Sequence, residues 1–97
     1  MKKTFPLTAP NKAPARQVEA VKFEIRKYLA RERRKTPKEG SDFWDFDCRV
    51  GKDAESADVI TAAEINKGID QVALSNSDKV YVEILAKPGF KTKKPGV

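Results

Sequence analysis

Three stretches of the chain carry apolar residues at regular spacings, and these spacings limit the folds open to it. Residues 42–50 and 79–86 alternate between apolar and polar side chains, which is typical of half-buried strands. A third stretch has the spacing of a helix with one apolar face. That stripe consists of Val18, Val21, Ile25, Tyr28 and Leu29. A compact domain commonly has about 100–150 residues, so the 97 residues predict a single core.

The remaining elements follow from local signals. Pro14 suits the first turn of the long helix, and Pro37 ends it near Arg34 or Lys35. A turn after Val50 leads into a weaker second strand at residues 56–60. Thr61 followed by Glu64 is a capping box that opens a second helix. That helix carries Ile65, Ile69, Val72 and Ala73, and Gly68 within it weakens the prediction.

The resulting order is (β)αββαβ, which predicts an α+β two-layer sandwich with an antiparallel sheet and two helices on one face. We expect a ferredoxin-like arrangement if residues 2–7 pair as a strand, and a three-stranded variant if Pro6 prevents this. The predicted domain covers residues 1–87, in which residues 1–13 are an arm and linker. We expect Pro88 and Gly89 to end the last strand and residues 88–97 to form a flexible basic tail.

Charge is sorted along the chain. Residues 1–40 hold twelve Lys or Arg against four Glu, whereas residues 41–85 hold four basic and ten acidic residues. Residues 86–97 add four lysines and no acid, and the net charge is +6. This pattern indicates a basic helix and tail on a more acidic body, which attracts polyanions or acidic protein surfaces.

The long helix has a second face opposite its apolar stripe, where Arg16, Phe23, Lys27 and Arg34 cluster. Phe23 could stack on an unpaired base while the cations contact phosphates, or it could cover the N-terminal arm, the tail or a second subunit. Further candidate cations follow in the run from Arg31 to Lys38 and in the tail. The full candidate set for nucleic-acid or anion binding is Arg16, Phe23, Lys27, Arg31, Arg33, Arg34, Lys35, Lys91, Lys93 and Lys94.

Catalytic chemistry has little support. The chain has no histidine, one cysteine and no glycine-rich phosphate loop, so we expect no enzyme and no cofactor. Asp45 and Asp47 share one face of a strand and form a weak candidate pair for Mg²⁺ or Ca²⁺, although no third ligand is evident. Cys48 and Trp44 face inward and are interpreted as core residues.

The open sheet face is expected to present Phe43, Asp45, Asp47, Tyr81 and Glu83. Its carboxylates would repel phosphates, so the sheet does not resemble an RNA-recognition surface. Any nucleic acid should therefore bind the helix and the tail.

No apolar run approaches the roughly 18 residues of a membrane span, and prolines occupy the place of a signal-peptide core. With a lone cysteine, this favours a cytoplasmic setting without membrane contact.

Three stretches carry a family resemblance: residues 2–7 (KKTFPL), residues 43–49 (FWDFDCR) and residues 81–89 (YVEILAKPG). Together they resemble a family of small, uncharacterised bacterial proteins, mostly from proteobacteria. The resemblance implies a stand-alone cytoplasmic bacterial protein and brings no activity or ligand.

Two functions remain open at this point. The first is a non-enzymatic binding domain for an anionic partner, RNA or a ribonucleoprotein, that uses the basic helix and tail. The alternative is a protein–protein adaptor or homodimer, in which acidic and basic surfaces of two molecules meet.

Overall fold

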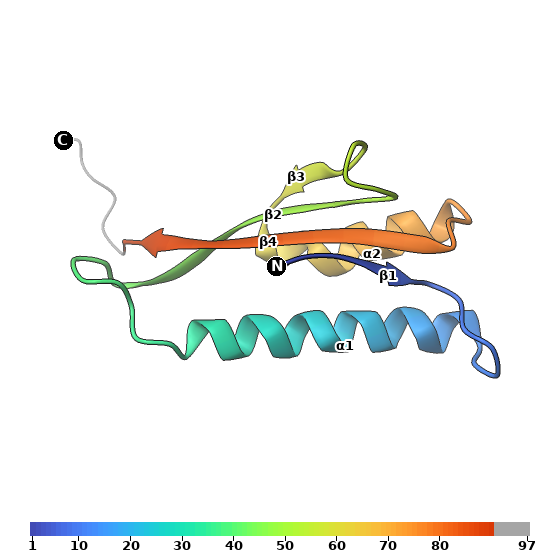
Figure 1. The fold of residues 1–97 in the computed structure, drawn as a ribbon, viewed down its shortest axis with the longest axis horizontal. Helices are drawn as coiled ribbons and strands as arrows, with labels where there is room; N and C mark the ends of the chain where they lie inside the picture. The colour runs from blue at the N-terminus through green and yellow to red at the C-terminus, as the bar shows by residue number, and fades with distance from the viewer. Residues whose placement is uncertain (91–97) are drawn as a thin grey trace.

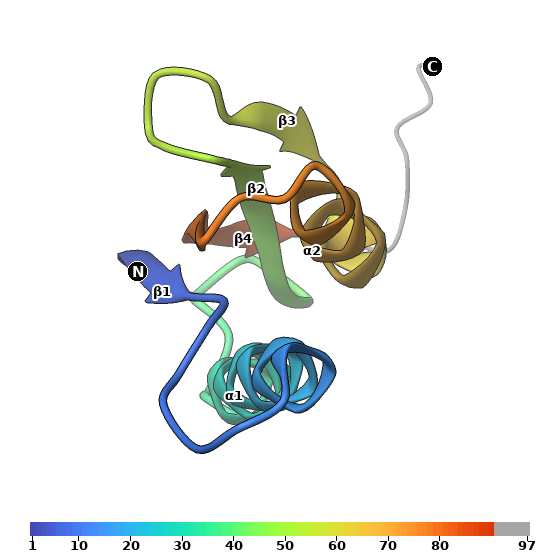
Figure 2. The same cartoon turned by 90° about the vertical axis from the view of Figure 1, so that its right-hand side faces the viewer.

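The computed structural model describes residues 1–90 of the chain and shows a four-stranded antiparallel sheet with two helices. Figure 1 shows the elements, and Figure 2 shows the two helices lying on the same side of the sheet. In chain order they are β1 (Lys2–Pro6), α1 (Pro14–Arg33), β2 (Phe43–Gly51), β3 (Asp58–Ile60), the short 3₁₀ helix η1 (Ala62–Glu64), α2 (Ile65–Leu74) and β4 (Lys79–Gly89). The predicted α+β two-layer sandwich is confirmed.

The strand order is β1-β4-β2-β3, and every neighbouring pair is antiparallel. Residues 2–6 do form a strand, so the four-stranded version of the prediction holds. β4 lies between β1 and β2, and β2 lies between β3 and β4. Each βαβ unit is therefore split by one intervening strand.

The core lies between the sheet and the two helices. Alternate residues of β2 and β4 face inward because successive side chains of a strand point to opposite faces. The buried residues are Phe5 and Leu7 near β1, Phe46, Cys48 and Val50 on β2, Val80, Val82 and Ile84 on β4, Val21, Ile25 and Leu29 on α1, and Ile65 and Ile69 on α2. Cys48 is fully buried and Trp44 packs partly buried against this cluster, which confirms both as core residues.

The helix boundaries match the local signals closely. α1 begins at Pro14, whose fixed φ suits a first turn, and its C-cap is Arg34. After α1, the Trp44 indole Nε1 donates a hydrogen bond to the Thr36 carbonyl at 3.1 Å and ties the linker to the sheet. At the second helix, the Thr61 N–H donates to Glu64 Oε1 at 3.3 Å, and the first turn is 3₁₀.

β4 corrects the prediction that Pro88 and Gly89 end the strand after Ala86, because the strand continues through Gly89. Beyond Glu83, β2 is the only strand neighbour of β4 among residues 1–90. A proline without an N–H donor is compatible with such a free edge. A Cβ at position 89 would overlap the Phe43 ring, so the exposed Phe43 side chain would have to move to admit any other residue.

The loop between β2 and β3 folds back over the sheet. A Cβ on Gly51 would lie 2.5 Å from the Ala57 Cα, so the close approach requires glycine. β3 has three residues, shorter than the predicted 56–60. It pairs with β2 only from Cys48 to Val50.

Ile69→Ala tests the burial of α2. Ile69 is fully buried, so the free energy of unfolding should fall by about 2–5 kcal/mol through lost apolar contact and a residual cavity. Leu74→Ala is the matched control on the same helix, because Leu74 is 81% exposed. Urea unfolding followed by circular dichroism measures both. Equal losses in the two variants would contradict the packing of α2.

Candidate functional site

The face of α1 that points away from the core brings several predicted residues together. Val21, Ile25 and Leu29 are buried on one side of the helix. At 100° per residue, the opposite side carries four of the candidates. We call this the outer face of α1, and it consists of Arg16, Phe23, Lys27 and Arg34, all exposed.

Phe23 is the centre of the outer face. Its side chain is 53% exposed, the Lys27 Nζ lies 5.4 Å from its ring centroid, and the Arg26 Cζ lies 5.9 Å away. These distances are within the range of cation–π attraction. Phe23 lines two hollows with residues of the N-terminal arm, one with Lys3, Phe5, Pro6 and Lys12 and the other with Lys12. An exposed aromatic ring flanked by cations therefore faces outward.

Ion pairing divides the cations of α1 into two groups. Lys22 pairs with Glu19 at 3.3 Å and with Asp70 of α2 at 2.6 Å. The hydrogen bond to Asp70 raises the pKa of Lys22 above its usual value. Just after the helix, Lys35 pairs with Glu32 at 3.0 Å. Among the predicted cations within residues 1–90, Lys35 is thus distinguished by an ion pair inside the protein.

Among residues 1–90, the cations of the outer face form no ion pair. This holds for Arg16, Lys27 and Arg34, and also for Arg31 at the flank of the helix. Arg33 lies elsewhere: its Cζ is 5.5 Å from the Phe46 ring centroid, on the side that faces the sheet. Arg33 therefore does not join the outer face. Lys91, Lys93 and Lys94 lie outside the described residues.

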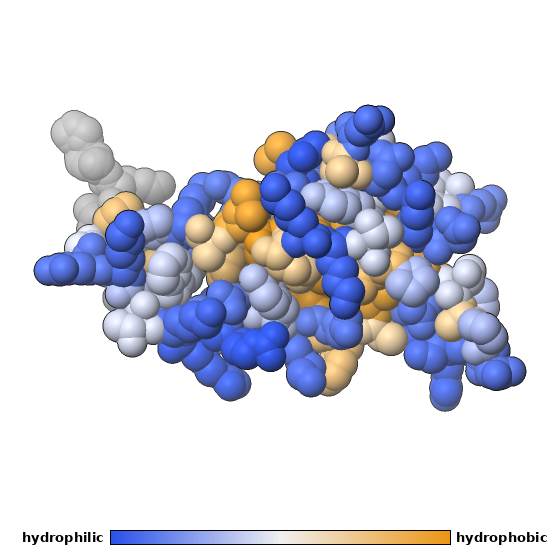
Figure 3. Space-filling view, in the orientation of Figure 1, coloured by the Kyte–Doolittle hydropathy of each residue, from blue (hydrophilic) through white to orange (hydrophobic). Residues whose placement is uncertain are grey.

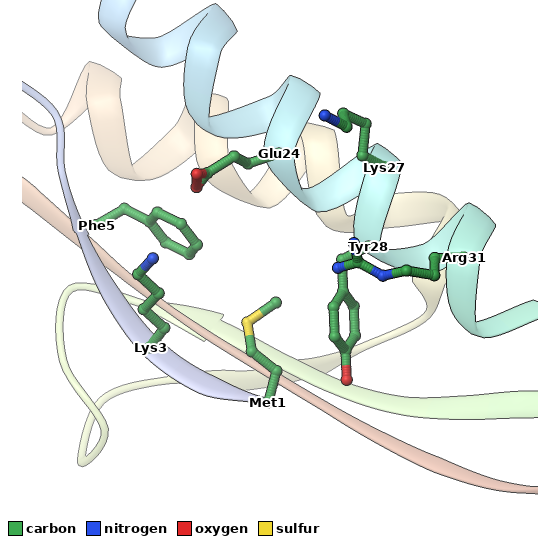
Figure 4. Close-up of a pocket in the computed structure, with 7 residues that line it drawn as sticks. All are labelled: Met1, Lys3, Phe5, Glu24, Lys27, Tyr28 and Arg31. Atoms are coloured by element: carbon green, nitrogen blue, oxygen red, sulfur yellow. The ribbon is translucent and has the colours of Figure 1, made fainter.

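A groove between β1 and α1 adds residues that the sequence pattern did not reveal. Figure 4 shows its first part, with a volume of about 300 Å³. Its lining residues are Met1, Lys3 and Phe5 from the β1 side and Glu24, Lys27, Tyr28 and Arg31 from α1. A second hollow of about 450 Å³ shares Lys3, Phe5 and Glu24 and continues towards Lys12 and Phe23.

The groove combines cations with aromatic rings. Lys3 Nζ lies 4.9 Å from the Phe5 ring centroid, and Arg31 Cζ lies 6.0 Å from that of Tyr28. In the described part of the chain, Glu24 is the only acidic residue that lines either hollow. In Figure 3, hydrophilic residues cover most of the lower edge, where α1 lies, and apolar surface is visible at the level of the strands. The groove therefore has an apolar interior and a basic rim.

The open sheet face is occupied by its own contacts. Tyr81 donates from its hydroxyl to Glu83 Oε1 at 2.8 Å, and Arg49 Nη1 lies 3.6 Å from the same oxygen. Arg49 Nη2 also donates to the carbonyls of Ala54 and Ala57 at 3.1 and 3.0 Å. This network holds the β2–β3 loop against the sheet.

The weak metal pair gains no support from its surroundings. Lys87 Nζ lies 2.7 Å from Asp47 Oδ1, and Asp45 Oδ1 accepts a hydrogen bond from the Phe46 N–H at 2.8 Å. Within residues 1–90, no group of three or more histidine, cysteine or acidic side chains could hold a metal ion. Burial raises the pKa of the Cys48 thiol, as do the nearby aspartates, and a buried neutral thiol is a poor nucleophile.

The comparisons with known proteins give one match. Residues 1–95 match a family described as a family of unknown function, DUF6172. The chain belongs to this family. No curated protein and no solved structure matches it. Within the described part of the chain, neither helix is long and apolar enough to cross a membrane.

The Tyr81–Glu83 hydrogen bond predicts a shifted titration. Donation to Glu83 raises the pKa of Tyr81 above 10.0. A raised folded-state pKa means that this contribution to stability is present below pH 10.0 and is lost as the pH rises through the folded-state pKa. In Tyr28→Phe, the remaining tyrosine absorbance at 295 nm should titrate above pH 10.0. Adding Glu83→Gln should lower that midpoint, and an unchanged midpoint would contradict the network.

Proposed function

We propose that this chain is a non-enzymatic binding domain for single-stranded RNA, free or within a ribonucleoprotein, and that the outer face of α1 is its contact surface. The observation that carries the proposal is the exposed Phe23 ring between unpaired cations. Aromatic rings stack on unpaired bases of any sequence, and lysines and arginines beside them neutralise phosphates.

The acidic residues of α1 reinforce this arrangement. Glu19 and Glu32 are each held by a neighbouring lysine three residues away. These lysines therefore balance part of the negative charge of Glu19 and Glu32, although Lys22 also pairs with Asp70 of α2. Glu24 lies in the β1–α1 groove and not on the outer face. Arg26 and Lys27 flank the Phe23 ring, and Arg16 lines a hollow with it beside Glu19. This excess of positive charge supports an anionic ligand over a cationic one.

The sheet is a poorer candidate for the same partner. Its exposed aspartates and the engaged Glu83 place negative charge where phosphates would lie. Tyr81 is 8% exposed and its hydroxyl is bonded to Glu83, so little of its ring is available for stacking. The basic helix thus offers the better RNA surface of the two.

A competing candidate is self-association through opposite charges. Asp45, Asp47 and Glu64 line a hollow of about 370 Å³, together with Lys87, which pairs with Asp47, and Val59, which is 81% exposed. This acidic hollow could receive the outer face of α1 from a second copy. Gel filtration across ionic strength distinguishes the candidates, since a charge-driven dimer dissociates as salt rises. A monomer at every salt concentration contradicts self-association.

For the setting, we infer a cytoplasmic bacterial protein. The resemblance of the KKTFPL, FWDFDCR and YVEILAKPG stretches to bacterial proteins supports the origin. The lone Cys48 is a free, buried thiol, as is common in reducing compartments.

Phe23→Ala tests the stacking role of the outer face. Stacking on one base contributes about 1–3 kcal/mol, so affinity for a fluorescein-labelled ten-nucleotide oligouridine should fall about 5- to 150-fold. Fluorescence anisotropy in about 50 mM salt measures it. Lys67→Ala on α2 is the control, because Lys67 is exposed but lies outside the outer face. The proposal would be overturned if the unmodified protein showed no binding at concentrations up to roughly tens of micromolar.

Lys27→Ala tests the electrostatic part. Each phosphate contact contributes about 0.7 to the slope of log affinity against log salt for a single strand. We expect the slope to become shallower by about that amount in Lys27→Ala. The slope of Lys35→Ala should change less, since Lys35 is already paired with Glu32. Equal changes of the salt slope in both variants would indicate that the total charge, and not a phosphate contact at Lys27, determines binding.

A further inference from the structure

We infer that the groove between β1 and α1 binds an acidic peptide segment in extended conformation, which adds a strand to the free edge of β1. This goes beyond the proposed RNA contact, because it concerns a neighbouring surface, which shares Lys27 and Phe23 with the outer face, and a different class of partner. It depends on the backbone of β1, on the lining of the groove and on its charge.

β1 is an edge strand whose far side has no strand partner in the described sheet. Met1 and Ile84 exchange backbone hydrogen bonds of 2.6 and 2.8 Å, and the Leu7 N–H donates to the Asp78 carbonyl at 2.8 Å. In an antiparallel pair, residues whose backbone N–H and C=O groups bond to the partner strand alternate with residues whose groups point away from it. The backbone groups of Lys2, Thr4 and Pro6 therefore point away from β4.

A contact from α1 supports this assignment. The Gln17 Nε2 donates to the Pro6 carbonyl at 2.8 Å, so that carbonyl does point outward. Pro6 has no N–H to offer. This leaves the N–H and C=O groups of Lys2 and Thr4 available, and they are the groups that strand addition uses.

The helix completes the groove opposite this edge. Phe5 and Val21 are almost fully buried and form its apolar base, and Tyr28 flanks it from α1. A groove between an edge strand and a helix accepts a peptide whose backbone pairs with the strand and whose alternate side chains point towards the helix. β1 has five residues, so it can pair with about five residues of such a peptide.

The charge of the groove favours an acidic peptide. Lys3, Lys12, Lys27 and Arg31 line the two hollows, against Glu24 alone. None of these five residues forms an ion pair within residues 1–90. Strand addition by β1 of a second copy would bring lysines against lysines, which is unfavourable. Acidic side chains on the added strand would instead meet the cations of the rim.

The test uses the isotope-labelled full chain and the blocked hexapeptide Ac-Glu-Val-Glu-Val-Glu-Val-NH₂. We expect the peptide to slow amide hydrogen exchange at Lys2 and Thr4 by about tenfold or more at saturation, because their N–H groups become hydrogen-bonded. The Val59 amide on the opposite edge strand is the internal control. The Lys-Val peptide of equal length should leave Lys2 and Thr4 unchanged.

Backbone methylation separates strand addition from simple charge attraction. One version of the acidic peptide carries N-methyl groups on every second residue, at the positions whose N–H groups face β1. Its affinity for the protein should be at least tenfold lower. A second version, methylated on the alternate residues whose N–H groups point away from β1, should bind with unchanged affinity. Equal affinities for the two methylated peptides would overturn the inference, since charge is identical in both.

Protein variants give an independent readout. Thr4→Pro removes the outward N–H without removing a hydrogen bond to β4, so peptide affinity should fall while Thr4→Ala binds normally. Arg31→Ala should weaken binding several-fold, whereas Arg34→Ala on the outer face should not. Should oligouridine, and not the peptide, slow exchange at Lys2 and Thr4, the groove would be an RNA site and the inference would be wrong.

Discussion

The long pairing of β2 with β4 is the constraint on which the rest of the structure depends. The two strands pair through nine residue positions, from Phe43 opposite Gly89 to Gly51 opposite Tyr81. A shift by one residue would turn Asp45 and Asp47 into the core and expose Phe46 and Cys48. β1 joins the sheet only through β4, and α1 packs on the face that this register makes apolar. The groove and the outer face of α1 both follow from that register.

Much of this fold could be predicted from the sequence because its strongest signals are local. The alternation in residues 42–50, the stripe of α1 and the capping box at Thr61 each lead to an observed element. Tertiary context decided two points that the sequence analysis got wrong or left open: the wrong end of the last strand at Pro88 and the open pairing of residues 2–7. Pro88 remains in a strand because β4 has a free edge there, and Pro6 belongs to a strand because its backbone nitrogen points away from β4. Sequence alone shows a proline but not which side of the strand is free.

The candidate site was predictable only in part, for the same reason. Helical geometry was enough to group Arg16, Phe23, Lys27 and Arg34, since these residues share one element. It could not show that Lys35 is held by Glu32 or that Arg33 lies over Phe46. The groove escaped prediction because β1 and α1 meet through the fold and not through a motif. The available signal was weak: Lys3 and Phe5 alternate on the arm, and Tyr28 lies at the edge of the helical stripe.

The two proposed surfaces are not independent, because they meet at Lys27 and Phe23. Lys27 belongs to the outer face and also lines the groove, and Phe23 borders the second hollow. An acidic peptide in the groove would neutralise Lys27 and weaken the field that attracts RNA phosphates. Coupling between two binding sites is reciprocal, so RNA would reduce peptide affinity by the same factor. A domain built in this way would respond to which of its two anionic partners is more abundant.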